Sequence, residues 1–327
     1  MIVPATAENV ARAATALAAG ELVAFPTETV YGLGANARDA AALGRLFAAK
    51  GRPLEHPVIV HLANAQALPR WARSVPPGAS ALAAAFWPGP LTLILPRAEG
   101  VLDAVTGGQD GVGLRVPAQP IAHALLAQLA GRGCDGIAAP SANRFGRISA
   151  TTAKHVADEF GDAIALILDG GPSRHGIEST IVDFTGGDPV LLRPGSITSE
   201  ALARVLGAAP RSAGQGETRA PGTLASHYAP RTKALLLPRS ELLAALAGLG
   251  GPGSHISVLA HSVAQPPEFE GAWFDAPGES ARYAQQLYAN LRALDAREAD
   301  EIWIEAPPDG PDWVAIGDRL RRATHRD

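Results

Sequence analysis

Residues 25–34 read Phe-Pro-Thr-Glu-Thr-Val-Tyr-Gly-Leu-Gly and directly follow an apolar run that begins at Leu22. The run has the composition of a buried strand, and Pro26 ends it. The glycines that follow allow backbone geometries that residues with side chains resist. Further along, residues 50–57 read Lys-Gly-Arg-Pro-Leu-Glu-His-Pro. Together the two segments supply hydroxyls, glycines and two cations for an anionic ligand, so the sequence predicts a strand that opens into a ligand-binding loop.

Apolar runs alternate with helical patterns on both sides of this loop. Thr6 and Asp39 are suitable N-caps for helices that end near Gly20 and Lys50. The predicted strands are 21–25, 58–62, 91–95, 113–116, 137–139, 164–168, 179–184 and 190–193. The predicted helices among them are 119–130 and 152–160, with a short helix that begins at Ser199. This order is typical of an α/β fold with a twisted mixed sheet.

The domain organisation follows from a change in composition. Residues 207–232 are rich in Ala, Gly, Pro and Arg without periodicity, which is typical of a linker. Beyond them lie short apolar runs at 235–237, 256–259 and 302–304, with helical patterns near 240–248, 280–294 and 313–323. We therefore predict a first domain over residues 1–206, a linker over 207–232 and a small αβα layered C-terminal domain over 233–327. A chain of 327 residues suits two domains.

The composition favours a soluble protein of a reducing compartment. Hydrophobic residues make up 47% of the chain and charged residues 18%, which supports well-formed cores. Cys134 is the single cysteine, so no internal disulfide and no cysteine-based metal cage can form. The sequence contains no apolar run of about 18 residues, and its N-terminus does not resemble a secretory signal. We expect a cytoplasmic protein without a membrane span.

Net charge argues against nucleic acid as the partner. The chain carries a net charge of −4, and residues 1–205 hold 16 Lys and Arg against 17 Asp and Glu. Proteins that bind duplexes usually have an excess of positive charge. We therefore expect no direct, stable nucleic-acid binding. Seven cations nevertheless lie in or beside Gly-, Pro- and Ser-rich turns, where they suit a small anion: Lys50, Arg52, Arg115, Arg144, Arg147, Arg174 and Arg193.

Two arginines among these are candidates for binding phosphate or carboxylate. Arg52 lies between Gly51 and Pro53 and presents a planar, permanently charged fork. Arg115 projects from a strand that ends at Pro117, so a rigid element would orient it toward a carboxylate. A solvated turn for Arg52 and a surface ion pair for Arg115 are the alternatives.

Histidine and serine side chains are weaker candidates. His61 lies inside an apolar strand, where it is either a buried core residue or a general base. His56 and His61 do not have the spacing of a helical zinc pair, so we predict no metal site made of protein side chains. Ser141 and Asn143 could donate hydrogen bonds to phosphate or sugar, or simply form a turn. The sequence lacks a Gly-x-Ser-x-Gly elbow, so we assign no nucleophile.

Eight segments, in matching order, resemble the threonylcarbamoyl-AMP synthase family, the YrdC-like proteins, in its long two-domain form. They are Pro26-Thr-Glu-Thr-Val-Tyr-Gly-Leu-Gly34, Lys50-Gly-Arg-Pro53, Pro57-Val-Ile-Val-His-Leu62, Trp87-Pro-Gly-Pro-Leu-Thr92, Leu114-Arg-Val-Pro117, Pro140-Ser-Ala-Asn143, Gly176-Ile-Glu-Ser-Thr-Ile181 and Leu192-Arg-Pro-Gly195. The segment Pro221-Gly-Thr-Leu-Ala-Ser-His-Tyr-Ala-Pro230 resembles the linker motif of that form. Residues 233–327 match only in general character.

The resemblance implies a nucleotidyltransferase that uses L-threonine, bicarbonate and ATP, with Mg²⁺ bound through the ATP phosphates. Its product would pass to the tRNA threonylcarbamoyl transfer machinery. The implied threonine residues are Thr29, His61, Arg115, Ala139 and Ser179. The implied ATP residues are Lys50, Arg52, His56, Gly111, Ser141, Asn143, Ser149, Arg193 and Tyr228. No catalytic residue is assigned, although Lys50, Arg52 and His61 are candidates.

Two other functions remain open at this point. YrdC-like domains also occur in carbamoyl-transfer enzymes, which are much longer and contain zinc-finger-like cysteines; the single Cys134 opposes that assignment. The second is an RNA-binding module in which the local arginines follow a nucleic-acid backbone. The nearly neutral first domain opposes it.

Overall fold

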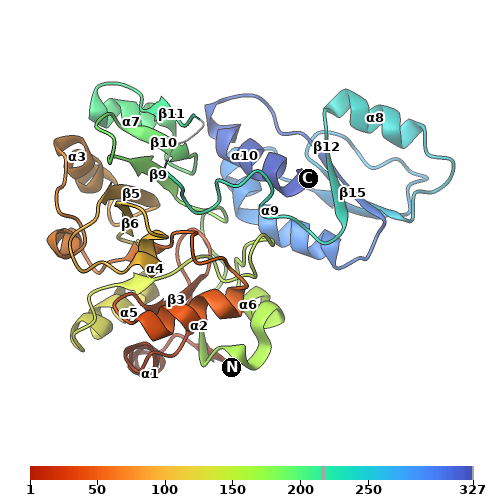
Figure 1. The fold of residues 1–327 in the computed structure, drawn as a ribbon. Coiled ribbons are helices and arrows are strands. Elements are labelled where there is room, and N and C mark those ends of the chain that lie inside the picture. Colours follow the sequence, from red (N-terminus) through yellow and green to blue (C-terminus); the bar gives the residue numbers. More distant parts are fainter. Residues whose placement is uncertain (215–217, 326–327) are drawn as a thin grey trace. The chain divides into compact units, whose positions relative to one another are not determined.

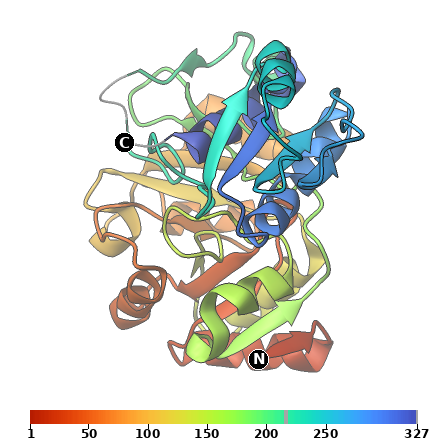
Figure 2. The ribbon, with the colours of Figure 1, turned by 90° about the vertical axis from the view of Figure 1, so that its right-hand side faces the viewer.

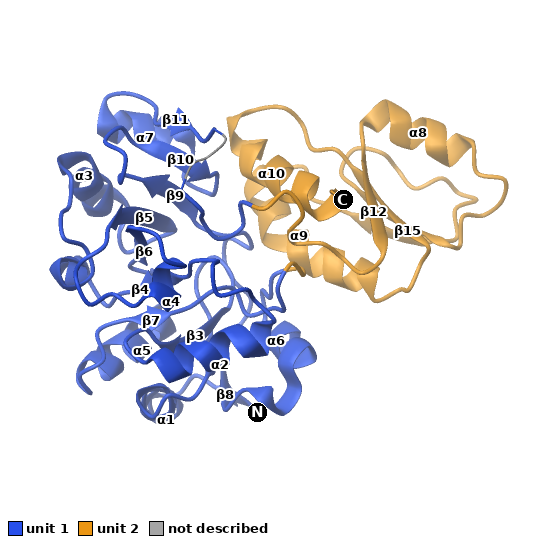
Figure 3. Cartoon of the chain, viewed as in Figure 1, with its two compact units in different colours: residues 1–145, 149–223 blue, residues 146–148, 224–327 orange. Residues whose placement is uncertain are grey.

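The structure is a computed structural model that describes residues 1–214 and 218–325. The chain divides into two compact units (Figures 1 and 3). Unit 1 comprises residues 1–145 and 149–223, and unit 2 comprises residues 146–148 and 224–327. Residues 215–217 of the predicted linker and residues 326–327 of the predicted C-terminal domain lie outside the described residues.

Unit 1 is built on one large mixed sheet. Its strands are β1 (Ile2–Pro4), β2 (Val23–Phe25), β3 (Gly32–Asn36), β4 (Ile59–His61), β5 (Leu91–Pro96), β6 (Gly111–Arg115), β7 (Ile137–Ala138), β8 (Leu166–Asp169), β9 (Thr180–Asp183), β10 (Val190–Arg193) and β11 (Arg211–Ser212). In the described part of the chain their order is β1-β8-β2-β3-β7-β4-β6-β5-β9-β10-β11. β4 and β6 run parallel, whereas β2 and β3 run antiparallel. The predicted mixed α/β sheet is confirmed.

Helices pack on both faces of this sheet. They are α1 (Ala7–Ala18), α2 (Ala40–Lys50), α3 (Pro77–Phe86), α4 (Asp103–Thr106), α5 (Pro120–Ala130), α6 (Ala153–Phe160) and α7 (Ser199–Leu206). Side chains alternate between the faces of a strand. Accordingly, Val23 and Phe25 of β2 join a core with α1 and α5, while Ala24 joins the core that contains α2, α3 and α6.

The predicted helix caps of α1 and α2 are present. The Thr6 hydroxyl accepts a hydrogen bond from the backbone N–H of Asn9 at 3.2 Å. The Asp39 carboxylate accepts from the backbone N–H of Ala41 at 2.8 Å. α2 ends at Lys50 and is capped by Gly51, whose φ of 61° lies in the left-handed region that favours glycine. This ending places Lys50 and the chain after it beside the binding loop.

The sequence did not predict β3 or α3. β3 reads Gly-Leu-Gly-Ala-Asn, and glycine and asparagine are depleted in strands. The glycines are needed there because Phe25 and Ile137 lie against the β3 backbone. α3 begins Pro-Gly-Ala-Ser, a composition that resembles a turn, although proline is well tolerated in the first turn of a helix.

Part of the predicted linker is ordered within unit 1. β11 pairs with β10, and the Thr218 hydroxyl donates to the Asp183 carboxylate at 2.5 Å. The backbone N–H of Arg219 donates to the side chain of Gln109 at 2.8 Å. Segment 218–221 therefore packs on the strands of unit 1 instead of forming a free tether.

Unit 2 is a small domain with the predicted αβα layers, and its sheet is parallel. Its strands are β12 (Lys233–Leu237), β13 (Ile256–Ala260), β14 (Ala272–Asp275) and β15 (Glu301–Glu305), in the order β12-β15-β13-β14 (Figure 2). α8 (Arg239–Ala247) covers one face, and α9 (Ser280–Asp295) and α10 (Val314–Thr324) cover the other (Figure 3). None of the described helices in either unit is long and apolar enough to cross a membrane.

Replacing Gly34 by alanine tests the tight packing of β3. The new Cβ would lie 2.9 Å from side-chain atoms of both Ile137 and Phe25. Such overpacking should lower the free energy of unfolding by about 1–3 kcal/mol. Gly44→Ala in α2 is the matched control, because nothing lies within 4 Å of its Cβ, and it should stabilise by about 0.5–1 kcal/mol. Chemical unfolding of both variants gives the comparison; equal midpoints would show that β3 tolerates a side chain.

Candidate functional site

The turn between β2 and β3 fixes two polar side chains inside unit 1. The Thr27 hydroxyl donates to the carbonyl oxygen of Val30 at 2.5 Å and accepts from the N–H of the same residue at 3.3 Å. Threonine hydroxyls commonly close turns in this way. As a result Glu28 and Thr29 are held with exposed fractions of only 5% and 1%.

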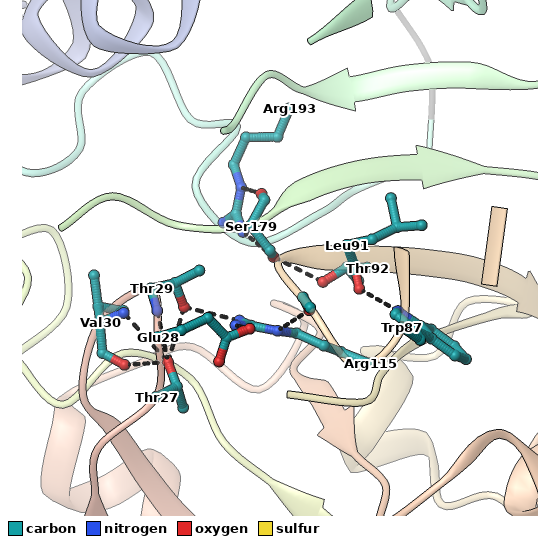
Figure 4. Close-up of polar contacts among 11 residues, drawn as sticks. Thr27, Glu28, Thr29, Val30, Trp87, Leu91, Thr92, Arg115, Ser179 and Arg193 are labelled. Atoms are coloured by element: carbon teal, nitrogen blue, oxygen red, sulfur yellow. Dashed lines mark hydrogen bonds and ion pairs between the residues drawn. The ribbon is translucent and has the colours of Figure 1, made fainter. Parts of the chain in front are cut away.

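Arg115 at the end of β6 meets this turn (Figure 4). Its Nη2 donates to Glu28 Oε1 at 2.6 Å, its Nη1 to the Thr29 hydroxyl at 2.9 Å, and its Nε to the Gly89 carbonyl at 3.2 Å. Guanidinium has five N–H groups, so each terminal nitrogen retains one N–H beyond these contacts. This pair of N–H groups suits a bidentate carboxylate.

Burial and the charge of Arg115 together shift the pKa values of two neighbouring groups, Glu28 and His61. Burial alone would raise the pKa of Glu28, but the charge and hydrogen bond of Arg115, together with the backbone N–H groups of Glu28 and Ala118, outweigh it and hold that pKa below its ordinary value. His61 is paired in register with Arg115 across β4 and β6. Burial, and then the Arg115 charge, lower the pKa of His61 to about 3. Glu28 is therefore ionised and His61 neutral near pH 7.

Ser179, just before β9, connects the predicted threonine and ATP residues. Its hydroxyl lies 2.8 Å from the Thr92 hydroxyl and accepts from Arg193 Nη2 at 3.1 Å (Figure 4). Arg193 also donates to the Ser179 carbonyl at 3.0 Å and to the Pro221 carbonyl at 2.8 Å. A single guanidinium group thus ties the strand end at Ser179 to segment 218–221.

Lys50 lies beneath the loop that carries Ser141 and Asn143. Its Nζ donates to the backbone carbonyls of both residues, at 2.6 Å for Ser141. Burial lowers the pKa of Lys50 well below its ordinary value, and the charge of Arg52 adds to the effect. In this structure Lys50 shapes the loop with hydrogen bonds to its backbone.

Arg52 and His56 gather around Phe145 at the end of the same loop. Arg52 Nη2 donates to the Pro57 carbonyl at 2.8 Å, and its guanidinium lies 5.4 Å from the Phe145 ring centroid. The His56 ring is 5.2 Å from the Phe145 ring. Burial, then the Arg52 charge, lower the pKa of His56. These residues form a second, cationic group near the Lys50 loop.

The other predicted residues are more scattered. Ala139 is buried just after β7, and the Ser149 hydroxyl donates to Glu178 at 2.6 Å. Gly111 begins β6 and lines a narrow pocket together with Pro57, Thr218 and other residues. Tyr228 belongs to unit 2, where its ring stacks on Tyr288 with the ring centroids 5.6 Å apart.

Sequence reasoning missed Glu28, Thr92 and Glu178 as members of this network. Each lies inside a segment that carries the family resemblance, but none of the three was assigned a role. A signal for Thr92 was available, because a polar residue interrupts the apolar run of β5. A signal for Glu28 was its place between two threonines after a buried strand. The described residues contain no group of three or more His, Cys, Asp or Glu that could hold a metal ion.

Comparison with known proteins identifies the family. A family model described as "Telomere recombination" matches residues 15–195, and one described as "Threonylcarbamoyl-AMP synthase, C-terminal domain" matches residues 197–324. The threonylcarbamoyl-AMP synthase of Pyrococcus abyssi is 40% identical over 93% of this chain and 91% of its own length. That of Bacillus subtilis is 38% identical over 96% of this chain and 92% of its own.

A solved structure agrees over both units. The crystal structure of P. abyssi Sua5 complexed with L-threonine is 37% identical and superimposes with a TM-score of 0.89, covering 99% of this chain and 97% of that one. The resemblance found in the sequence motifs is thereby confirmed. The chain belongs to the threonylcarbamoyl-AMP synthase family.

Proposed function

We propose that this protein is a nucleotidyltransferase that makes threonylcarbamoyl-AMP and pyrophosphate from L-threonine, bicarbonate and ATP. The product would serve tRNA threonylcarbamoyladenosine synthesis in the cytoplasm through a separate transfer machinery. The observation that carries the proposal is the buried Arg115 fork, which keeps one N–H on each terminal nitrogen for an amino-acid carboxylate. Family membership supports the same reaction.

The chemistry requires two bond-forming steps. The threonine amine attacks the carbon of carbon dioxide, which releases one proton as the carbamate forms, or the carbon of bicarbonate, which releases one water. An oxygen of the resulting carbamate then attacks the α-phosphorus of ATP, and pyrophosphate leaves. Positioning and charge neutralisation can supply much of the acceleration for such steps without a covalent protein intermediate.

We assign Arg115, Thr29, Ser179, His61 and the backbone at Ala139 to threonine. The pKa of about 3 makes His61 a weak base, so its proposed role is hydrogen bonding to threonine rather than proton removal. The ATP residues are proposed to be Lys50, Arg52, His56, Gly111, Ser141, Asn143, Ser149, Arg193 and Tyr228. Lys50 would act through the backbone of the loop it holds. Tyr228 is included on the family resemblance alone.

Magnesium is proposed to enter with the nucleotide. The described residues contain no group of three or more His, Cys, Asp or Glu suited to a metal ion, so the ATP phosphates would be its main ligands. We also propose that residues 1–206 are the catalytic domain, 207–232 the linker and 233–327 the C-terminal domain.

Pyrophosphate release should require threonine and bicarbonate together, because the species that is adenylated is the carbamate. The assay follows pyrophosphate from purified protein and ATP, with each substrate omitted in turn and bicarbonate removed by degassing. Release without bicarbonate, at the full rate, would indicate an enzyme that activates threonine directly. No release under any condition would favour a binding module.

Arg52→Ala should weaken ATP binding about tenfold or more. A charge-assisted hydrogen bond contributes about 1.5–3 kcal/mol, and each 1.4 kcal/mol is a factor of ten in affinity. Calorimetric titration with ATP measures the change, and threonine binding checks that the fold is intact. Arg70→Ala is the matched control, because the Arg70 side chain is 68% exposed. Unchanged ATP affinity in Arg52→Ala would reduce Arg52 to a structural residue of the turn.

His61 should make the folding stability depend on pH. Its pKa is about 3 in the folded protein and about 6.5 in an unfolded chain. Between these values the unfolded chain binds more protons, so stability rises with pH, by at most about 1.4 kcal/mol per unit. Unfolding free energies from about pH 5 to 6.5 should therefore rise more steeply in the wild type than in His61→Gln. Above about pH 7.5 the two curves should be parallel, because His61 is neutral in both states.

A further inference from the structure

Glu28 has a feature that its ion pair with Arg115 does not explain. Only Oε1 contacts the guanidinium group, at 2.6 Å. Oε2 is buried and has no hydrogen-bond partner among the residues that the structure describes. The side chain as a whole is 6% exposed. The backbone N–H groups of Glu28 and Ala118 lie near enough to this carboxylate to help lower its pKa, but neither makes a hydrogen bond of normal geometry to Oε2. A donor on a ligand would therefore satisfy an oxygen that is otherwise costly to bury.

The hydroxyl of Thr29, the residue after Glu28, can only accept a hydrogen bond from a ligand and cannot donate one. The Thr27 proton is used on the Val30 carbonyl at 2.5 Å, so in the 2.8 Å contact between the two threonine hydroxyls Thr29 must be the donor. Thr29 also accepts from Arg115 at 2.9 Å. Its remaining capacity is therefore acceptance, which suits an N–H or O–H group and excludes a carboxylate.

The arrangement is complementary to a zwitterion. Arg115 retains two N–H groups for an anion, and two acceptors, Glu28 Oε2 and Thr29 Oγ1, belong to groups that contact the same guanidinium. Resting on the proposed function, we infer that Glu28 binds the α-ammonium group of L-threonine while Arg115 binds its carboxylate. Glu28 is thereby a substrate-binding residue that selects ligands with a free α-amine.

The contact can persist as the amine reacts. The ammonium loses one proton before its nitrogen attacks and another as the carbamate forms, which leaves one N–H on the carbamate nitrogen. That N–H can still donate to Glu28 Oε2, so the nitrogen stays oriented for the second step. The low pKa of Glu28 makes it a poor final acceptor of the released protons, which must therefore pass to solvent or bicarbonate.

Two ligands separate recognition of the amine from recognition of the carboxylate. L-Threonine carries both groups, whereas (R)-3-hydroxybutanoate has the same carboxylate and hydroxyl but hydrogen in place of the amine. Ligand-observed NMR titration reaches millimolar affinities for both. In the wild type, threonine should bind about tenfold or more tightly than hydroxybutanoate, the size of one charge-assisted hydrogen bond. Equal affinities would overturn the inference without any variant.

Glu28→Gln then isolates the residue. The amide keeps an oxygen for Arg115 but removes the negative charge, so threonine affinity should fall about tenfold while hydroxybutanoate affinity stays within about twofold. Glu21→Gln, an exposed carboxylate of the same unit, is the matched control and should change neither. If Glu28 only holds Arg115 in place, both ligands weaken equally, and that result sinks the inference.

A second variant covers the case in which Glu28→Gln does not fold. Glu28→Asp keeps the charge beside Arg115 but withdraws the oxygens by one methylene, so it should also lose threonine selectively. Unchanged threonine affinity in a folded Glu28→Asp protein would contradict the inference. The wild type could release pyrophosphate from ATP, threonine and bicarbonate and yet bind threonine no more tightly than hydroxybutanoate. That result would support the proposed function and contradict the role of Glu28. Wild-type protein that does not bind threonine rejects both.

Discussion

The buried guanidinium group of Arg115 is the constraint on which the candidate site depends. A charge at 4% exposure is tolerated only when it is paired and hydrogen-bonded. Two segments that are distant from Arg115 in sequence supply its partners: the turn after β2 and the loop before β5. Displacing either of them would leave a buried donor without its acceptor. The contacts of this one guanidinium group therefore help to hold the Pro-Thr-Glu-Thr turn, and its charge acts together with burial to keep His61 neutral and against burial to keep Glu28 ionised.

Arg193 applies the same principle at the other end of the site. Its hydrogen bonds to Ser179 and to the Pro221 carbonyl hold segment 218–221 against the strand end that carries Ser179. A ligand that moves the Arg193 side chain would directly change the hydrogen bonds that it makes to Ser179. Lys50 holds the 141–143 loop in a similar way, by donating to two of its backbone carbonyls. Lys50 and Arg193, which the sequence suggests as contacts of a ligand anion, thus also bind backbone carbonyls of the protein. Substituting either residue would change the shape of the site as well as its charge.

Much of this architecture could be predicted from sequence because local signals agreed with the fold. Thr6, Asp39 and Gly51 mark helix ends by their own chemistry, and the apolar runs of β4, β5 and β9 indicate buried strands. β3 could not be predicted, because its glycines are required by Phe25, a neighbour brought in only by tertiary packing. The role of Lys50 was hidden for a similar reason: its partners are carbonyls about ninety residues away. Glu28 was passed over because a motif shows residue types, whereas an unpaired oxygen is a property of three-dimensional contacts.

The membership of residues 146–148 in unit 2 has a consequence for how such chains are assembled and shortened. The backbone N–H of Ala229 donates to the Gly146 carbonyl, and Arg292 donates to the Ile148 carbonyl. A gene cut after residue 223 would remove both donors while leaving both acceptors in place, inside a loop flanked by Phe145 and Ser149. Unit 2 is therefore made of two separate stretches of the chain, and hydrogen bonds join them. A single cut or fusion point in the linker cannot remove or add the whole of unit 2. Recombination there would transfer residues 224–327 without residues 146–148.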